Sequence, residues 1–388
     1  MKALVRTVSV AVLLLCAAVV ASAAAEPAPP SQPPATRPAR DLRDVVGVAH
    51  AGGKYPLTDG DYLNEGADVV LATGSRVIKV WFTPRPARDY PFNSRWPARV
   101  DSLVDLARTE HFRALFAKPF TTFVLDAFAP RRPDHYYRDG MTPADAARER
   151  RAMADLAAHL LETYQGTGKT FVIQNWEGDW SLRGGAPGTD PTDAQVRGMT
   201  DWLNARQDGV ADARTAAEAR GVRGVTVLHA AEVNHVARAM RGERTVTNDV
   251  LPHTRCDLYS YSAYDVPTDD PAKFRAALDY LAAKAPKPPG REGRHVYVGE
   301  YGFPERAVGG PEAQLAKVRS ATRTAIDWGA PYVLYWQVYC NEPVRPFDGR
   351  PAVEDMKGFW LVRPDGSRPP VTDWLKETLT APATRPGG

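Results

Sequence analysis

The chain has 388 residues and a formal net charge of +3, with 49 Lys and Arg spread among 46 Asp and Glu. No basic stripe concentrates the positive charge, so the composition does not favour nucleic acid as a partner. Cysteine is scarce, at three residues, which excludes a small disulfide-stapled scaffold.

Residues 1–25 show the three parts of a secretory signal peptide. Lys2 and Arg6 form a positive start, residues 8–20 are almost wholly apolar, and residues 21–23 are small enough for cleavage. The apolar run is too short to span a bilayer comfortably. We therefore expect a secreted or periplasmic protein that has no membrane attachment once the signal is removed.

Proline-rich segments lie on both sides of the remaining chain. Residues 26–40 read EPAPPSQPPATRPAR, and residues 381–388 have the same character. Such segments bury too little apolar surface to order themselves, so we expect a tether and a tail. No comparable break divides residues 41–380. We interpret this span as a single domain and expect a monomer.

Short apolar runs rich in Val, Ile, Phe and Tyr recur along that span. Several are almost continuously apolar, as is typical of parallel strands covered on both faces. Eight strands are predicted, at residues 45–51, 76–82, 121–128, 169–176, 224–232, 257–264, 295–302 and 331–339.

Amphipathic stretches between the strands predict helices. Residues 143–163 follow Thr142, a plausible N-cap, and begin with Pro143, which suits a first helical turn. Residues 193–220, 271–284 and 311–328 have the same pattern. Eight alternating strands and helices favour an α/β fold that closes as a (β/α)8 TIM barrel. A doubly wound open sheet is the alternative, but no strand is followed by a glycine-rich nucleotide-binding turn or a nucleophile elbow.

Two cysteines remain after the signal. Cys256 begins one predicted strand and Cys340 follows the end of another. Opposite ends of a strand are ~17–20 Å apart, whereas a disulfide requires Cα atoms within about 7 Å. Both thiols are therefore expected to be free.

No motif points to a metal or a cofactor. The histidines show no H-x-H or H-E-x-x-H spacing. Gly168-Lys169-Thr170 resembles the end of a phosphate-binding loop, but it precedes a strand instead of a helix. We expect the protein to work without either group.

Two glutamates stand where a barrel of this kind places its active site, at the carboxyl ends of the strands. By strand alternation, Ile173, Asn175 and Glu177 share one face, and so do Val296, Val298 and Glu300. If Ile173 points into the barrel, Glu177 lies at its mouth. The glycines on either side of Glu300 would leave the backbone room to approach a ligand.

This arrangement resembles the retaining glycoside hydrolases of clan A. In those enzymes an acid/base glutamate ends strand four, often beside an asparagine, and a nucleophile glutamate ends strand seven. A polar residue on strand six supports the nucleophile, and a tryptophan on strand eight forms the floor of the sugar subsite. The residues of this chain that match are Asn175, Glu177, Glu300, Trp336 and either Tyr261 or Tyr264.

The resemblance implies cleavage of an oligo- or polysaccharide, with β-linkages favoured, by a two-glutamate mechanism. Glu177 would be the acid/base and Glu300 the nucleophile, which requires the carboxyl groups to lie about 5–5.5 Å apart. This sequence departs from the family pattern in two places. Trp176 separates Asn175 from Glu177, and strand two offers Lys79 and Trp81 where the clan commonly has an arginine.

Other polar residues at strand ends are candidates for the same site. Glu232 could itself be the acid, and Glu232 or Asn234 could instead bind substrate or orient a carboxylate. Asp126 could act likewise or be structural. His229 is expected to be a satisfied core or near-site histidine.

Tryptophans at or beyond the strand ends suggest a carbohydrate, because aromatic faces stack on the apolar faces of sugar rings. The candidates are Trp81, Trp176, Trp180, Trp336 and Trp360. The alternative function is a sugar-binding barrel that does not cleave, because the inserted Trp176 could displace the acid. Hydrolysis of an ester or amide is less favoured, because no G-x-S-x-G motif is present.

Overall fold

The computed structural model describes residues 40–130, 133, 135–184 and 189–381. The expected signal peptide, nearly all of the tether and the residues after Ala381 lie outside this range. No helix in the described part of the chain combines the length and the apolar character that crossing a membrane requires.

Eight parallel strands close into a barrel in chain order, with the last strand paired to the first. All eight predicted strands are present. They are β1 (Val46–His50), β2 (Val77–Phe82), β3 (Thr122–Ala127), β4 (Lys169–Gln174), β5 (Val225–Val233), β6 (Leu258–Ser262), β7 (Val296–Tyr301) and β8 (Val333–Tyr335). The α/β fold class and the (β/α)8 barrel are therefore confirmed.

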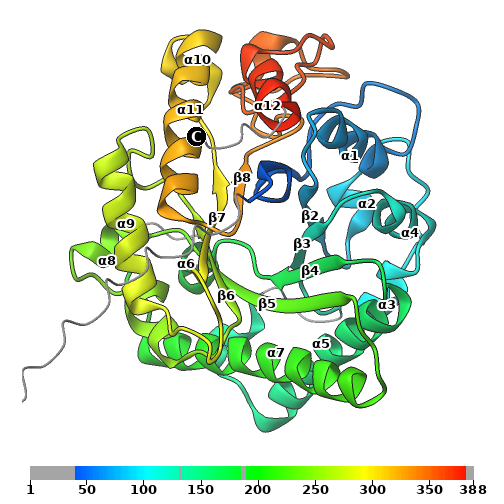
Figure 1. The fold of residues 1–388 in the computed structure, drawn as a ribbon, viewed down its shortest axis with the longest axis vertical. Coiled ribbons are helices and arrows are strands. Elements are labelled where there is room, and N and C mark those ends of the chain that lie inside the picture. Colours follow the sequence, from blue (N-terminus) through cyan, green and yellow to red (C-terminus); the bar gives the residue numbers. More distant parts are fainter. Residues whose placement is uncertain (1–39, 131–132, 134, 185–188, 382–388) are drawn as a thin grey trace, which may run out of the picture. The chain divides into compact units, whose positions relative to one another are not determined.

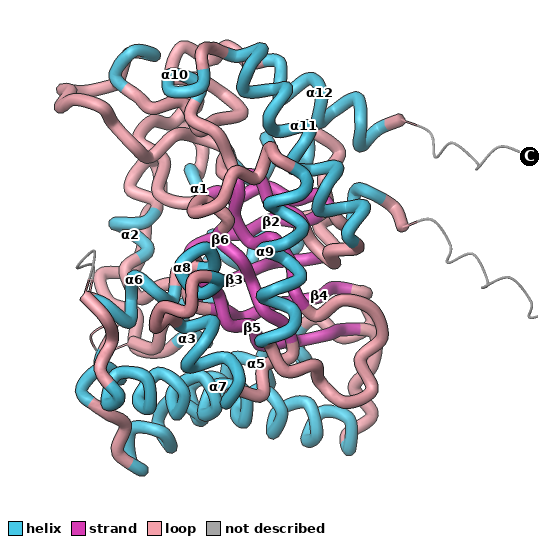
Figure 2. Tube along the Cα trace, turned by 90° about the vertical axis from the view of Figure 1, so that its left-hand side faces the viewer, coloured by secondary structure: helices cyan, strands magenta, loops and turns pink. Residues whose placement is uncertain are grey.

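The longer helices form a layer outside the strands (Figures 1 and 2). They are α1 (Tyr62–Ala72), α4 (Glu110–Ala117), α5 (Pro143–Thr163), α7 (Asp193–Ala219), α9 (Pro271–Lys284), α11 (Pro311–Trp328) and α12 (Pro370–Thr380). Shorter α-helices are α2 (Pro86–Asp89), α3 (Leu103–Ala107), α6 (Gly178–Arg183), α8 (Val236–Met240) and α10 (Glu305–Val308). Short 3-10 or π turns are η1 (Leu42–Asp44), η2 (Tyr136–Asp139), η3 (Val246–Val250), η4 (Leu251–His253) and η5 (Val353–Asp355).

Local chemistry explains why α5 begins where the sequence predicts. The Thr142 hydroxyl accepts a hydrogen bond from the Asp145 backbone N–H at 3.1 Å, and the Asp145 carboxylate accepts one from the Thr142 N–H at 3.2 Å. This reciprocal pair satisfies two backbone donors that the first helical turn leaves open. Pro143 occupies the first position, where it needs no donor.

Two apolar layers lie on opposite faces of the strands. A small interior cluster consists of Val77, Val124, Val172, Ala230, Leu258, Tyr297 and Leu334. The larger cluster lies between the strands and the helices and includes Ile173, Val296 and Val298. Ile173 therefore faces the helices, so the condition under which strand alternation would place Glu177 at the mouth is not met. The apolar pattern gave no phase, because strands covered on both faces carry apolar residues at every position.

Both glutamates nevertheless reach the mouth of the barrel, for local reasons. Strand β4 ends at Gln174, and Glu177 adopts a positive φ of 27°, so strict alternation no longer applies at that point. In β7 the register with β8 shifts between Val298 and Tyr301. The path of the backbone after the strand, and not the phase of the strand, sets the position of each carboxyl group.

Cys256 and Cys340 are both buried and unbonded, as predicted.

Candidate active site

A layer of polar side chains lies above the apolar interior cluster. Each member stands two residues after an interior apolar residue, so it points to the same side of its strand. The members are Lys79 on β2, Asp126 on β3, Gln174 on β4, Glu232 on β5 and Ser260 on β6, and all five are fully buried. The barrel interior therefore changes from apolar to charged toward its carboxyl end.

Lys79 is the cation of this layer. Its Nζ lies 2.9 Å from Glu232 Oε2, 2.6 Å from Glu300 Oε1 and 3.4 Å from Asp126 Oδ2. These carboxylates raise the pKa of Lys79 well above its usual value, against the opposing effect of burial. One buried ammonium group thus joins three strands to Glu300.

Glu232 accepts hydrogen bonds from four different residues. Its Oε2 accepts from Lys79 Nζ, from Gln174 Nε2 at 2.9 Å and from Ser260 Oγ at 2.7 Å. Its Oε1 accepts from the Glu177 backbone N–H at 3.1 Å. Glu232 does not line the cavity. It lies beneath the cavity, bonded to the backbone of Glu177 and to Lys79.

Gly299 is needed for this packing. A Cβ at Gly299 would lie 1.8 Å from Ser260 Oγ and 2.6 Å from Glu232 Oε2. At Gly302 a Cβ would lie 2.7 Å from the Trp336 carbonyl oxygen. The expectation that these glycines make room for a ligand is wrong, because both make room for neighbouring parts of the protein.

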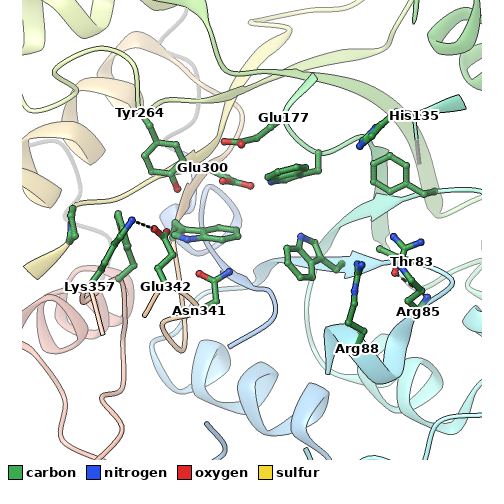
Figure 3. A pocket seen from close by; sticks show the side chains of 16 residues that line it. Thr83, Arg85, Arg88, His135, Glu177, Tyr264, Glu300, Asn341, Glu342 and Lys357 are labelled. Atoms are coloured by element: carbon green, nitrogen blue, oxygen red, sulfur yellow. Dashed lines mark hydrogen bonds and ion pairs between the residues drawn. The ribbon is translucent and has the colours of Figure 1, made fainter. Parts of the chain in front are cut away.

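Above the polar layer lies a cavity of about 680 Å³, which crosses the mouth of the barrel (Figure 3). Its aromatic walls come from Trp81, Phe128, Trp176, Tyr264, Trp336 and Phe359. Glu177 and Glu300 both line it, and Figure 3 shows their carboxyl groups on one side of the cavity with Tyr264 beside them. The structure thus brings together both predicted glutamates and four of the predicted binding residues: Trp81, Trp176, Tyr264 and Trp336.

The two cavity carboxyl groups have different electrostatic surroundings. Burial, followed by the charges of Glu300 and Glu232, raises the pKa of Glu177 well above its usual value. Burial also raises the pKa of Glu300, but the directly bonded Lys79 opposes this, and the value is about 7. The Ser262 hydroxyl lowers the pKa of both. Burial thus raises the pKa of both carboxyl groups, and the bonded Lys79 favours ionisation of Glu300 relative to Glu177.

Three other predicted binding residues lie away from the cavity. The Asn175 side chain forms two hydrogen bonds with the backbone of Glu232 on β5: it accepts one from the N–H at 3.0 Å and donates one to the carbonyl oxygen at 3.1 Å. The Tyr261 hydroxyl donates to Asp265 at 2.5 Å. Asn234 accepts from the Asp179 N–H at 3.0 Å. Each is engaged in holding the protein's own loops.

Asp126 and His229 also lie outside the cavity. Asp126 accepts from Gln174 Nε2 at 2.7 Å within the buried polar layer. Burial raises the pKa of its carboxyl well above the usual value. His229 lies under the helices against Arg206 Nε at 3.2 Å, so it is a buried histidine of the core.

Two predicted tryptophans do not reach the cavity. Trp180 packs against His235 with ring centroids 5.0 Å apart. Trp360 is fully buried, and its indole N–H donates to Glu305 at 2.8 Å.

The sequence did not identify several polar residues of the cavity wall. They lie in the segments after β2, β3 and β8, with Arg88 on α2, and they are Thr83, Arg85, Arg88, His135, Asn341, Glu342 and Lys357. Their only signal in the sequence is a position after a strand, which many loop residues share. Lys79 was noted as a departure from the family pattern but was not assigned to the site.

Within the described residues, no group of three or more His, Cys, Asp or Glu side chains is arranged to hold a metal ion. The carboxylates of the polar layer instead have Lys79 as their cation.

Comparison with solved structures finds the same barrel fold in glycoside hydrolases. No protein-family model and no curated protein sequence matches the chain. A GH5_18 structure from Streptomyces cattleya, in complex with Manβ1-4GlcNAc, is similar over 88% of this chain and 83% of its own, with 16% identity and a TM-score of 0.56. An exo-β-1,4-mannosidase from Opitutaceae bacterium strain TAV5 is similar over 86% of this chain and 59% of its own, with 13% identity and a TM-score of 0.54. At these identities the likeness establishes a shared barrel fold.

Proposed function

We propose that the protein is an exported glycoside hydrolase that cleaves a glycan, with β-linkages favoured, by a retaining mechanism. The observation that carries the proposal is that Glu177 and Glu300 line the same aromatic cavity. Of these two glutamates, Glu300 is the one that forms an ion pair with Lys79. Glycoside cleavage requires one protonated and one ionised carboxyl group at the same bond. The contact with Lys79 supports Glu300 as the ionised member of the pair.

In the first half of the reaction, Glu300 attacks the anomeric carbon while Glu177 donates its proton to the leaving oxygen. The product is a glycosyl ester on Glu300. In the second half, Glu177 removes a proton from water, the water attacks the anomeric carbon and the ester bond to Glu300 breaks. Two displacements at one carbon retain its configuration.

The aromatic walls support a sugar as the substrate. Trp81, Trp176 and Trp336 line the same cavity as the two carboxyl groups. Aromatic rings provide flat apolar surface for sugar faces, while the carboxyl groups act at the glycosidic oxygen and the anomeric carbon.

The test is hydrolysis of a panel of β-linked polysaccharides and aryl glycosides by the wild type and three variants. Glu177→Gln and Glu300→Gln should each abolish turnover of unactivated substrates, and Glu232→Gln should weaken it. If Glu232→Gln were the lethal change and Glu177→Gln mild, the acid would be on β5. Glu377→Gln, exposed on α12, is the matched control.

A non-catalytic sugar-binding barrel is the second candidate, favoured by the insertion of Trp176 between Asn175 and Glu177. Binding of a glycan without turnover on any member of the panel would support it.

A further inference from the structure

One end of the cavity carries arginine side chains that the proposed reaction does not use. Arg85 and Arg88 follow β2, and His135 follows β3. In a closed eight-stranded barrel, β2 and β3 lie across from β6 and β7, which are the strands before Tyr264 and Pro304. Figure 3 shows Arg85, Arg88, Thr83 and His135 on the opposite side of the cavity from Tyr264, Glu342 and Lys357.

A buried carboxylate fixes the guanidinium of Arg88 in this wall. Arg88 Nε and Nη2 donate to Asp89 Oδ1 at 3.1 and 3.0 Å. Asp89 is fully buried and also accepts from the Thr83 hydroxyl. The Arg88 side chain is 61% exposed, and its Nη1 has no hydrogen bond with any described residue. It is therefore an oriented cation with a donor still available at the cavity wall.

The opposite end of the cavity differs in charge. Lys357, its cationic residue, forms an ion pair with Glu342 at 2.7 Å, and Glu342 lines the same cavity. That pair is neutral within the wall, so a ligand meets no net charge from it. At the other end, Asp89, which holds Arg88, is fully buried beneath the wall, whereas the Arg88 side chain is 61% exposed.

We propose that Arg88, at the β2–β3 end of the cavity, binds an acidic substituent on the glycan, a sugar carboxylate or a sulfate ester. A guanidinium group presents parallel N–H donors whose spacing matches the oxygens of these anions, and charge-assisted hydrogen bonds are about twice as strong as neutral ones. The proposal rests on the proposed function and specifies its substrate class. The substrate is a glycan with an acidic sugar at the β2–β3 end of the cavity.

The test compares substrates that differ only in the acidic group. Aryl β-glucuronide is paired with aryl β-glucoside, aryl β-galacturonide with aryl β-galactoside, and sulfated with unsulfated oligosaccharides. The acidic member of at least one pair should have the higher kcat/KM. The pair that shows the preference identifies carboxylate or sulfate as the group bound. The preference should weaken as ionic strength rises, because salt screens the attraction.

Substitution of Arg88 tests whether this residue causes the preference for the acidic substrate. Arg88→Gln should reduce the ratio of acidic to neutral kcat/KM by about tenfold or more, mainly through KM, and Arg88→Lys should restore part of it. Arg323→Gln, exposed on α11, is the matched control and should leave the ratio unchanged. Equal turnover of both members by the wild type, or an equal loss on both in Arg88→Gln, would overturn the proposal while leaving glycoside hydrolysis intact.

If no substrate is turned over, the proposed function fails, and a binding measurement tests the cationic subsite separately. Acidic and neutral oligosaccharides are then titrated into the wild-type protein and into Arg88→Gln, and binding is measured by calorimetry. Selective binding of the acidic member that is lost in Arg88→Gln would support the cationic subsite. Equal binding of both members, or binding of neither, would refute it.

Discussion

The backbone N–H of Glu177 donates to the Glu232 carboxylate at 3.1 Å, so a buried side chain on β5 holds the turn after β4. Glu177 has a φ of 27°, a conformation that costs about 1–3 kcal/mol for a residue with a side chain. The same carboxylate binds Lys79, which binds Glu300. A single buried network thus holds the backbone of Glu177 and the carboxyl group of Glu300.

Glu232→Gln should change the pH dependence of activity as well as the level of activity. The charge of Glu232 raises the pKa of both Glu177 and Glu300. A neutral glutamine removes that effect, so both limbs of the kcat/KM profile should move to lower pH. The measurement is a pH–rate profile of the variant beside the wild type. A loss of activity with an unmoved profile would show that Glu232 acts only through packing.

Lys79→Met should move the acid limb in the opposite direction. Lys79 lowers the pKa of Glu300, so its removal should raise that pKa and reduce the ionised fraction at neutral pH. Breaking a buried ion pair from one side also costs about 3–5 kcal/mol of stability. Activity is therefore measured at a temperature at which circular dichroism shows that the variant is folded. Lys79→Arg keeps the charge and is the control. An acid limb that does not move in folded Lys79→Met would contradict the account.

The pH profile of the wild type should be bell-shaped, with an acid limb near pH 7 that reflects ionisation of Glu300. The two limbs belong to the interacting pair, since the charge on each carboxyl affects the pKa of the other. With a dinitrophenyl leaving group, which needs no protonation, Glu177→Gln should lose the basic limb and keep the acid limb. Persistence of the basic limb would mean that another group supplies the proton.

Stability should depend on pH through Glu177. Its pKa in the folded protein is raised, so the favourable contribution of its proton is complete below its unfolded pKa and is lost as pH rises through the folded pKa. A tenfold difference in proton affinity between the folded and unfolded states corresponds to about 1.4 kcal/mol of stability. Glu177→Gln should match the wild type at pH 4 and be the more stable protein at pH 8, by chemical denaturation. Glu377→Gln should show no such difference, and a similar gain there would refute the assignment to Glu177.

The sequence predicted the elements well because each carries its own local signal. The apolar runs with β-branched and aromatic residues predicted the eight strands. Thr142 and Pro143 predicted the start of α5, and Pro271 and Pro311 begin α9 and α11 as expected. Capping and proline preferences act within a few residues, so they can be interpreted without a structure.

The sequence could not predict which face of each strand is interior. Val172 and Ile173 are both apolar and both buried, but Val172 faces the barrel interior and Ile173 the helices. The sequence also could not predict the ion-pair partners of Lys79, because Glu232 and Glu300 are 153 and 221 residues away along the chain. Only closure of the barrel brings them together, and no local pattern encodes that contact.

The central claim is that Glu300 attacks the anomeric carbon, and covalent trapping tests it most directly. The protein is incubated with an activated 2-fluoro glycoside of its preferred sugar, whose glycosyl ester accumulates because fluorine slows both displacements. Intact-mass and peptide mass spectrometry should find one glycosyl group on the peptide that contains Glu300, and none in Glu300→Gln. An adduct on Glu177 or Glu232, or turnover of a β-linked substrate that releases the α-anomer first, would contradict the account.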